Sequence, residues 1–197
     1  MKFNKVYIPR DAIERHEDFE MWYEDGSVFS TVHSEGDWQQ ESDKVSFNNR
    51  FGAHMAQIRP DPNTLAYFLR VERYEYTFHT YILFEEYFVE GCLWEVYGSL
   101  TKPPVNYWHT DDKNNAVHIR LTNFKNKGEC FEVKVRDVSY LRIAAVSAVA
   151  MMIKEYYKGR SEGIIEENVS IMQKAKRLFK SGKGITWEEI QAGKRYV

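Results

Sequence analysis

The 197-residue sequence holds few of the features that mark a known chemistry. It has two cysteines, Cys92 and Cys130, and neither lies in a CxxC pair, which argues against a disulfide framework. No HExxH, GxSxG, P-loop or GxGxxG motif occurs, so no metal, cofactor or catalytic residue is predicted. The N-terminal residues lack the apolar core of a signal peptide, and we therefore expect a cytoplasmic protein with free thiols.

A strongly basic surface is also missing. The net charge is −2, and residues 11–47 hold eleven acidic side chains against two basic ones. Residues 154–197 hold ten basic and six acidic side chains, a modest excess that fits either a solvated helix face or contact with an anionic surface. A nucleic-acid-binding protein needs a stronger basic face than this, so we expect no nucleic-acid partner.

Aromatic residues are abundant, at 15% of the chain, and they favour strands. About ten short strands are predicted, separated by turn signals such as Asp25-Gly26. Their stretches are FEMWYEDGSVFSTV (two strands, 19–32), VSFNN (45–49), HMAQIR (54–59), TLAYFLRVER (64–73), TFHTYILFEE (77–86), LWEVYGSL (93–100), VNYWHT (105–110), AVHIRLTNF (116–124) and FEVKVRDVS (131–139). This spacing indicates an antiparallel sandwich or barrel.

One stretch differs from the rest. From Ile143 to Ile153 there is no charge, and the only polar side chain is Ser147, which can bond back to the carbonyl of Ile143. Eleven helical residues rise about 16 Å, whereas the hydrocarbon core of a bilayer is about 30 Å thick. The stretch is therefore too short to span a membrane. A helix that is apolar on every side must be enclosed by protein.

The strands and the apolar helix together predict the fold class. We expect a closed antiparallel β-barrel with a central hydrophobic C-terminal helix, because closure removes the sheet edges and the helix fills the lumen. The barrel is predicted for residues 1–158, with the helix at 140–158, and a short helical tail is predicted for 159–197.

The order of these features resembles the tubby C-terminal-like superfamily, in its LURP-one-related and phospholipid-scramblase-like branch. The resemblance is carried by AQIR (56–59) before TLAYFLRVE, by Gly91, Trp94, Val96 and Gly98 within YFVEGCLWEVYGSL, and by VKVRDVSYLRIAAVSAVAMMIKEYY (133–157). It covers about residues 15–158. The resemblance implies a barrel of about twelve strands around a C-terminal helix. It also implies a relation to phosphoinositide binders, whose basic residues hold phosphate.

Basic residues in or near turns are the candidate binding residues. Lys125, Lys127, Arg136 and Arg142 are the candidates for a phosphate or lipid head group, and Arg70 and Arg73 flank another strand end. Solvated turn side chains are the alternative. A metal pair at His109 and His118 is not expected, because pairing Trp108 with His118 would put the two imidazoles on opposite faces.

The tail forms a second candidate interface. GIIEENVSIMQKAKRLFKSGKG reads as an amphipathic helix whose apolar stripe includes Ile165, Val169, Met172 and Phe179. This stripe is expected to dock on the barrel wall, on a second copy in a homodimer, or on a membrane.

The sequence thus favours a non-enzymatic binding or scaffold domain for an anionic lipid head group or a protein partner. The alternative is an enzyme or small-molecule carrier with a pocket at the barrel mouth. Lipid scrambling, which the family name suggests, is disfavoured by the shortness of the apolar helix.

Overall fold

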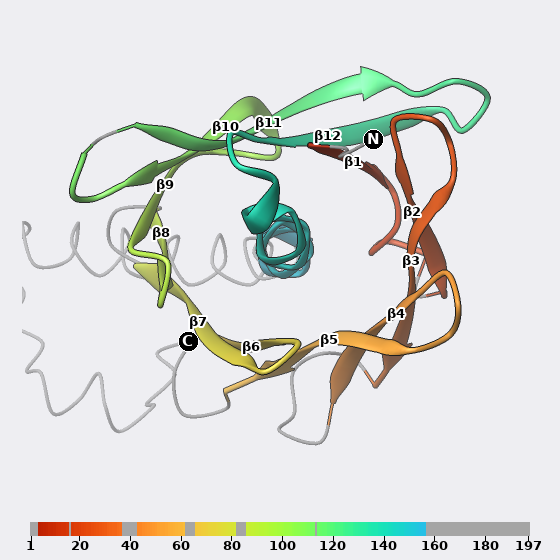
Figure 1. Ribbon diagram of the computed structural model, residues 1–197, viewed down its shortest axis with the longest axis horizontal. Helices are drawn as coiled ribbons and strands as arrows, with labels where there is room; N and C mark the ends of the chain where they lie inside the picture. The colour runs from red at the N-terminus through yellow and green to blue at the C-terminus, as the bar shows by residue number, and fades with distance from the viewer. Residues whose placement is uncertain are drawn as a thin grey trace, which may run out of the picture. The chain divides into compact units, whose positions relative to one another are not determined.

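A closed barrel surrounds one helix in the computed structural model of the protein (Figure 1). The structure describes residues 4–15, 17–36, 43–61, 66–81, 86–112 and 114–156, which belong to one compact unit, Met1–Tyr156. The predicted tail, with Ile165, Val169, Met172 and Phe179, lies outside the described residues.

The barrel is an antiparallel ring in which each strand pairs with its chain neighbours and β1 pairs with β12. Its twelve strands are β1 (Lys5–Pro9), β2 (Phe19–Tyr23), β3 (Val28–Glu35), β4 (Lys44–Asn49), β5 (His54–Pro60), β6 (Tyr67–Val71), β7 (Tyr74–Tyr81), β8 (Glu86–Glu90), β9 (Trp94–Ser99), β10 (Lys102–His109), β11 (Asn115–Asn123) and β12 (Glu129–Val135). The predicted fold class is confirmed.

Two strands were missing from the sequence prediction, which found about ten. One is β1, whose Val6 faces Val133 of β12 and closes the ring. The other is β8, of which the predicted stretch 77–86 included only Glu86. The sequence between β7 and β8, ILFE, contains no Gly, Pro, Asn or Asp, so no turn residue marks the break between the two strands.

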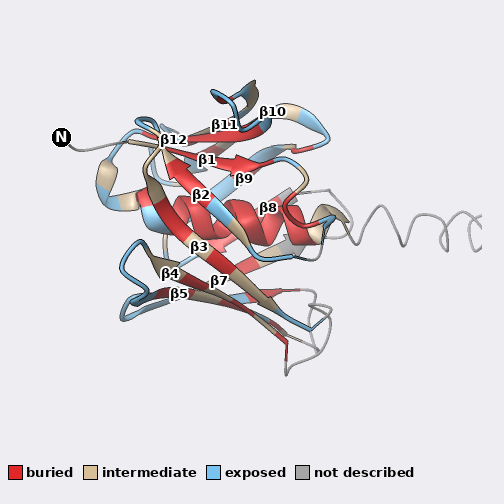
Figure 2. Ribbon diagram, turned by 90° about the vertical axis from the view of Figure 1, so that its right-hand side faces the viewer, coloured by how far each residue is buried: buried red, intermediate tan, exposed pale blue. Residues whose placement is uncertain are grey.

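The central helix, residues 141–156 in the described part of the chain, follows a short 3₁₀ turn at Val138–Tyr140. Every side chain from Ile143 to Ile153 is at most 6% exposed, so the helix is buried on all sides, as predicted (Figure 2). Large strand side chains pack around it, among them Trp94, Tyr107, Phe47 and Phe78. Among the described residues, no helix is both long and apolar enough to cross a membrane.

Ser147 is the polar side chain of the buried helix, and its partner differs from the predicted one. Its hydroxyl donates to the carbonyl of Ala144 at 3.0 Å, one residue later than the predicted Ile143. It also lies 3.4 Å from the hydroxyl of Tyr107 on β10. The bond within the helix and the contact to the wall together satisfy a polar group that would otherwise be costly to bury.

The C-terminal part of the helix is fixed to the β9–β10 turn by one carboxylate. Glu155 accepts hydrogen bonds from the backbone N–H groups of Leu100 and Thr101, at 3.0 and 3.2 Å, and from the hydroxyls of Ser99 and Tyr87, at 3.1 and 3.4 Å. Burial raises the pKa of Glu155, although these hydrogen bonds oppose the shift. Four donors around one carboxylate set both the depth and the rotation of the helix in the barrel.

The start of the helix is fixed on other strands. Asp137 caps the 3₁₀ turn by accepting from the backbone N–H of Ser139 at 2.9 Å, and Arg142 forms an ion pair with Glu72 in the β6–β7 turn. Tyr140 packs edge-on against Trp94 of β9, with ring centroids 5.3 Å apart. The helix is therefore held at both ends as well as along its length.

Tight packing around the helix makes its stability sensitive to side-chain volume. Ala148 and Val149 are 1% and 0% exposed. We expect Ala148→Leu to cost about 1–3 kcal/mol of unfolding free energy by overpacking, and Val149→Ala to cost a similar amount by leaving a cavity. Chemical denaturation measures both, with Lys134→Ala on the exposed face of β12 as the control. Midpoints equal to wild type for both core variants would contradict a filled lumen.

Candidate functional site

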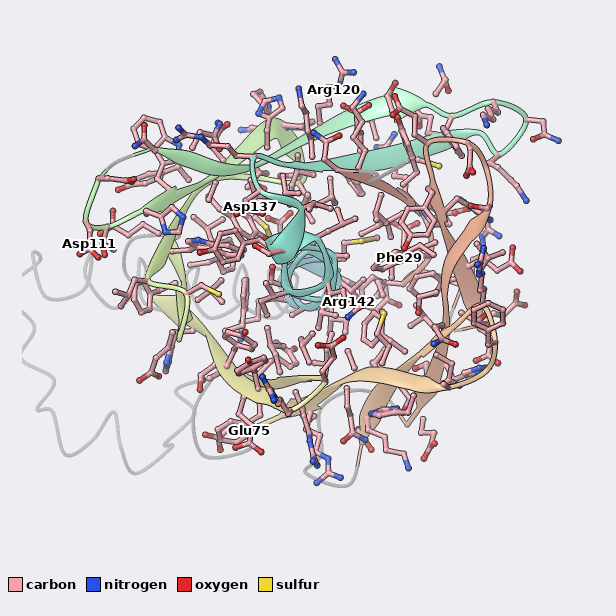
Figure 3. The ribbon with its side chains drawn as sticks, in the orientation of Figure 1. Phe29, Glu75, Asp111, Arg120, Asp137 and Arg142 are labelled. Carbon is pink, nitrogen blue, oxygen red and sulfur yellow. The ribbon has the colours of Figure 1, made fainter. Side chains whose placement is uncertain are left out.

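A pocket of about 590 Å³ lies on the outer wall of the barrel over β5 to β8, next to the β8–β9 turn. It is built mainly from outward-facing side chains, so it is separate from the helix-filled interior. Figure 3 shows Glu75, one of its residues, on the outside of the ring of strands. The lining consists of Gln57, Arg59, Phe68, Leu69, Arg70, Glu75, Tyr76, Thr77, Glu90 and Gly91.

The two-residue period of the strands places the polar lining side chains outside. In β6, Tyr67, Leu69 and Val71 are buried, whereas Phe68 and Arg70 are exposed. The register then sets neighbours across the strands, because facing positions share one side of a sheet.

Two cross-strand rows result from that register. One row joins Gln57, Arg70 and Glu75 across β5, β6 and β7. The next row runs along the same outer face from Arg59 on β5 through Phe68, Thr77 and Glu90. Arg59 and Arg70 therefore sit diagonally on neighbouring strands and share one side of the wall.

Both arginines are exposed on the outer wall and have no counterion among the described residues. No hydrogen bond or ion pair joins the side chain of Arg59 or Arg70 to another described residue, although Glu75 stands opposite Arg70 in the register. The other carboxylate of the pocket, Glu90, is already engaged, because its Oε2 lies 2.8 Å from Nε2 of His79. Two guanidinium groups on one wall are thus left for an external anion.

Gly91 shapes the edge of the pocket. Its φ of +90° is one that side-chain-bearing residues rarely adopt, and a Cβ there would meet a ring carbon of Tyr76 at 2.8 Å. The glycine of the family-like stretch YFVEGCLWEVYGSL is therefore required where the β8–β9 turn passes close to β7.

A contrasting set of charged side chains lies on the wall of β1, β11 and β12, where the buried carboxylate of Glu132 has hydrogen-bond donors within the protein. Glu132 is 4% exposed and accepts two hydrogen bonds from Arg120, at 2.9 and 3.2 Å, and one from the Tyr7 hydroxyl at 2.9 Å. Burial works to raise the pKa of Glu132, but the bonds from Arg120 and Tyr7 outweigh it and hold that pKa below its ordinary value. This satisfied network is structural.

The predicted candidates Lys125 and Lys127 come together in the β11–β12 turn. The Lys127 ammonium lies 4.6 Å from the ring centroid of Trp22, and the Lys125 ammonium lies 5.3 Å from that of Phe124. Both rings belong to a buried cluster on the outer wall that also contains Tyr7. These lysines therefore already make cation–π contacts within the protein.

The other two predicted candidates do not join the lysines. Arg142 lies at the start of the central helix, inside the ring of strands (Figure 3), and is paired with Glu72 across the barrel from β12. Arg136 is exposed just after β12, and its backbone N–H donates to the carbonyl of Ala116. The structure thus brings together two of the four candidates and places the other two elsewhere. The sequence did not single out Arg59.

The two histidines considered for a metal lie on opposite sides of the wall, as expected, although the predicted register was wrong. His118 pairs with Asn106 instead of Trp108, because the hairpin turn comes earlier in the chain than predicted: Trp108 faces Asn115, and the backbone N–H of His109 donates to the carbonyl of Asn114. The ring of His109 packs against Tyr140 at the end of the helix, whereas His118 bonds to Asn106 outside. The described residues contain no group of three potential metal ligands.

Comparison with known proteins adds one structural relative. No protein-family model and no curated protein matches the sequence. An X-ray structure of a protein from Arabidopsis thaliana is similar to this chain with a TM-score of 0.52 and 13% sequence identity. The match covers 78% of this chain and 90% of that one, so the similarity extends over the barrel and concerns the fold.

The two kinds of charged cluster predict different effects on stability. Replacing Arg59 and Arg70 by Gln breaks no hydrogen bond or ion pair to a described residue, so the free energy of unfolding should change by less than about 0.5 kcal/mol. Tyr7→Phe keeps the ring but removes a hydrogen bond to buried Glu132, and should cost about 1–2 kcal/mol. Urea denaturation of both variants compares the two walls. A large loss in the double arginine variant would show that these arginines are structural.

Proposed function

We propose that the protein is a non-enzymatic binding module of the tubby-like barrel class that holds an anionic head group on its outer wall. The observation that carries the proposal is the pair Arg59 and Arg70, two arginines without a described counterion in one pocket. The central helix fills the lumen, so a ligand must bind on the outer wall or at the turns, and the pocket lies on the outer wall.

The pocket offers the chemistry that a phosphorylated, hydroxyl-bearing head group needs. Arginine presents a planar fork of N–H donors that fits phosphate oxygens in a bidentate manner. Glu75 and the amide of Gln57 provide acceptors for hydroxyl groups next to the phosphate. Phe68, which is 51% exposed, adds an apolar edge that a lipid or an acidic peptide can cover.

The assignment to the tubby-like class is part of the proposal. It is supported by the closed twelve-stranded ring around a C-terminal helix, which the sequence resemblance implied. The similarity to the Arabidopsis structure agrees with the same ring over most of both chains. A cytoplasmic location, expected from the sequence, would give the pocket access to anionic lipids of the inner leaflet.

A small-molecule enzyme or carrier is the second candidate, favoured by one observation. His79 and Glu90 lie 2.8 Å apart beside the pocket, as an acid–base pair would. Their side chains are 37% and 62% exposed, so solvent screens the pair, and catalytic groups gain most in a water-excluded site. The arginine pair therefore decides in favour of binding.

Titration with a soluble inositol bisphosphate tests the proposal without a membrane. Wild-type protein should bind it, and Arg59→Gln with Arg70→Gln should weaken binding at least tenfold, because charge-assisted hydrogen bonds are worth about 1.5–3 kcal/mol each. Calorimetry at fixed ionic strength gives the dissociation constants.

The matched control is the double variant Lys125→Gln and Lys127→Gln, which should bind like wild type. If binding instead follows these two lysines, the site predicted from the sequence is the right one and the pocket is wrong. An acidic peptide that competes better than the inositol phosphate would favour a protein partner. Turnover of a phosphoester that depends on His79 would favour the enzyme.

A further inference from the structure

Three turns at one end of the barrel expose large apolar side chains. Phe51 in the β4–β5 turn is 79% exposed, Tyr74 beside the β6–β7 turn is 50% exposed, and Leu93 in the β8–β9 turn is 47% exposed. Alternate hairpin turns of an antiparallel ring lie at the same end. By the order of the strands, these three turns lie at the end where the chain leaves β12 and enters the central helix. We call these three side chains the rim tips.

Phe51 is held out by a well-ordered turn. The side-chain oxygen of Asn49 accepts from the backbone N–H groups of Phe51 and Ala53, at 2.9 and 3.1 Å. Asn49 and Ala53 also pair through their backbones, and Gly52 takes a φ of +80°. The turn therefore holds the phenyl ring in solvent, where it stays 79% exposed although the Arg50 guanidinium lies over it.

Leu93 is exposed in a backbone conformation that leucine rarely adopts. Its φ of +52° lies in the left-handed region, where a Cβ is crowded and Gly or Asn is preferred. Its carbonyl accepts from the backbone N–H of Thr110 at 3.0 Å, but its half-exposed side chain gains little burial to offset the unfavourable conformation. Such a combination indicates selection for something outside the folded chain.

Each aromatic tip has an arginine beside it. The Arg50 guanidinium lies 4.6 Å from the ring centroid of Phe51, and the Arg73 guanidinium lies 5.1 Å from that of Tyr74 and donates to its hydroxyl at 2.9 Å. Acidic side chains occupy other turns of the same end, namely Glu24, Asp25, Asp111 and Asp112. The β6–β7 turn also carries Glu72, but that carboxylate is paired with Arg142, so Arg50 and Arg73 dominate the charge beside the rim tips.

The spacing of the tips fits a lipid surface better than a protein. A protein interface concentrates its binding energy in one packed cluster at its centre. Here the apolar side chains stand singly on three neighbouring turns, and an arginine lies beside each of the two aromatic ones. Apolar groups below the head groups and arginines level with the phosphates are the arrangement that an anionic bilayer accepts.

We infer that this end of the barrel docks on an anionic membrane, with Phe51, Tyr74 and Leu93 inserted at the interface and Arg50 and Arg73 against the lipid phosphates. The acidic turns are repelled by the same surface, so the barrel stands tilted on its β4–β9 side. The inference goes beyond the head-group pocket and uses other residues.

Insertion is measured directly with Phe51→Trp in the full chain. Phosphatidylcholine vesicles that contain phosphatidylserine and brominated acyl chains should quench this variant more than wild type, since bromine acts on a tryptophan inside the bilayer. Tyr97→Trp, at an exposed aromatic position on the wall of β9, is the control and should show no added quenching. Equal quenching of the two variants overturns the inference, even if another part of the chain binds the vesicles.

Binding variants separate the apolar from the electrostatic contribution. Phe51→Ser and Leu93→Asn should each lower vesicle partitioning about tenfold. Arg50→Gln and Arg73→Gln should each lower it about fivefold and reduce its salt dependence. Because Asn tolerates the left-handed conformation, Leu93→Asn should keep or raise the melting temperature while binding falls.

Unchanged partitioning of these variants overturns the inference, as does a wild-type chain that does not bind anionic vesicles. Failure here leaves the pocket proposal standing, because the pocket is tested with a soluble inositol phosphate. Conversely, if the chain does not bind the soluble inositol phosphate but Phe51→Trp is quenched in the bilayer, membrane docking through the rim tips is supported and the pocket proposal is wrong.

Discussion

The buried helix is the constraint on which the rest of the structure depends. Its eleven residues from Ile143 to Ile153 expose almost nothing, so they have no stable surface in water and must be enclosed. A ring of strands can do this only if it closes, and closure rests on the pairing of β1 with β12. The first and last strands of the barrel therefore meet because the helix that follows needs a complete wall.

Filling the lumen also decides where binding chemistry can lie. Inward positions of the strands are committed to the helix, and Ser147 has its partners inside. Polar groups that interact with other molecules are left on the outer wall or in the turns. On that wall Glu132 is buried among its internal partners, whereas Arg59 and Arg70 are exposed and have no counterion among the described residues. That difference, rather than the amount of positive charge, separates a structural cluster from a candidate site.

The fold could be predicted from the periodicity of apolar residues. The pocket could not, because it depends on how the strands are aligned with one another. An apolar helix and alternating aromatic strands can be recognised in a single sequence, because each depends on local spacing. β8 was missed because no turn residue precedes it, and the pairing of His118 was wrong because the turn between β10 and β11 lies earlier in the chain than predicted. Arg59 and Arg70 are eleven positions apart, and only the register of β5 with β6 makes them neighbours. No local pattern contains that information.

The dependence on register also explains why the basic turn residues were an incomplete prediction of the binding site. A lysine in a turn is accessible, yet Lys127 lies over Trp22 and is occupied by an internal contact. Leu93 was predicted as the first residue of a strand. Its left-handed backbone and its exposure instead make it unfavourable in the folded chain. Local rules of folding are broken where a residue serves another purpose. In this barrel such residues are the rim tips at one end and the arginine pair on the outer wall. The β8–β9 turn contributes to both, because Gly91 lines the pocket and Leu93 is a rim tip.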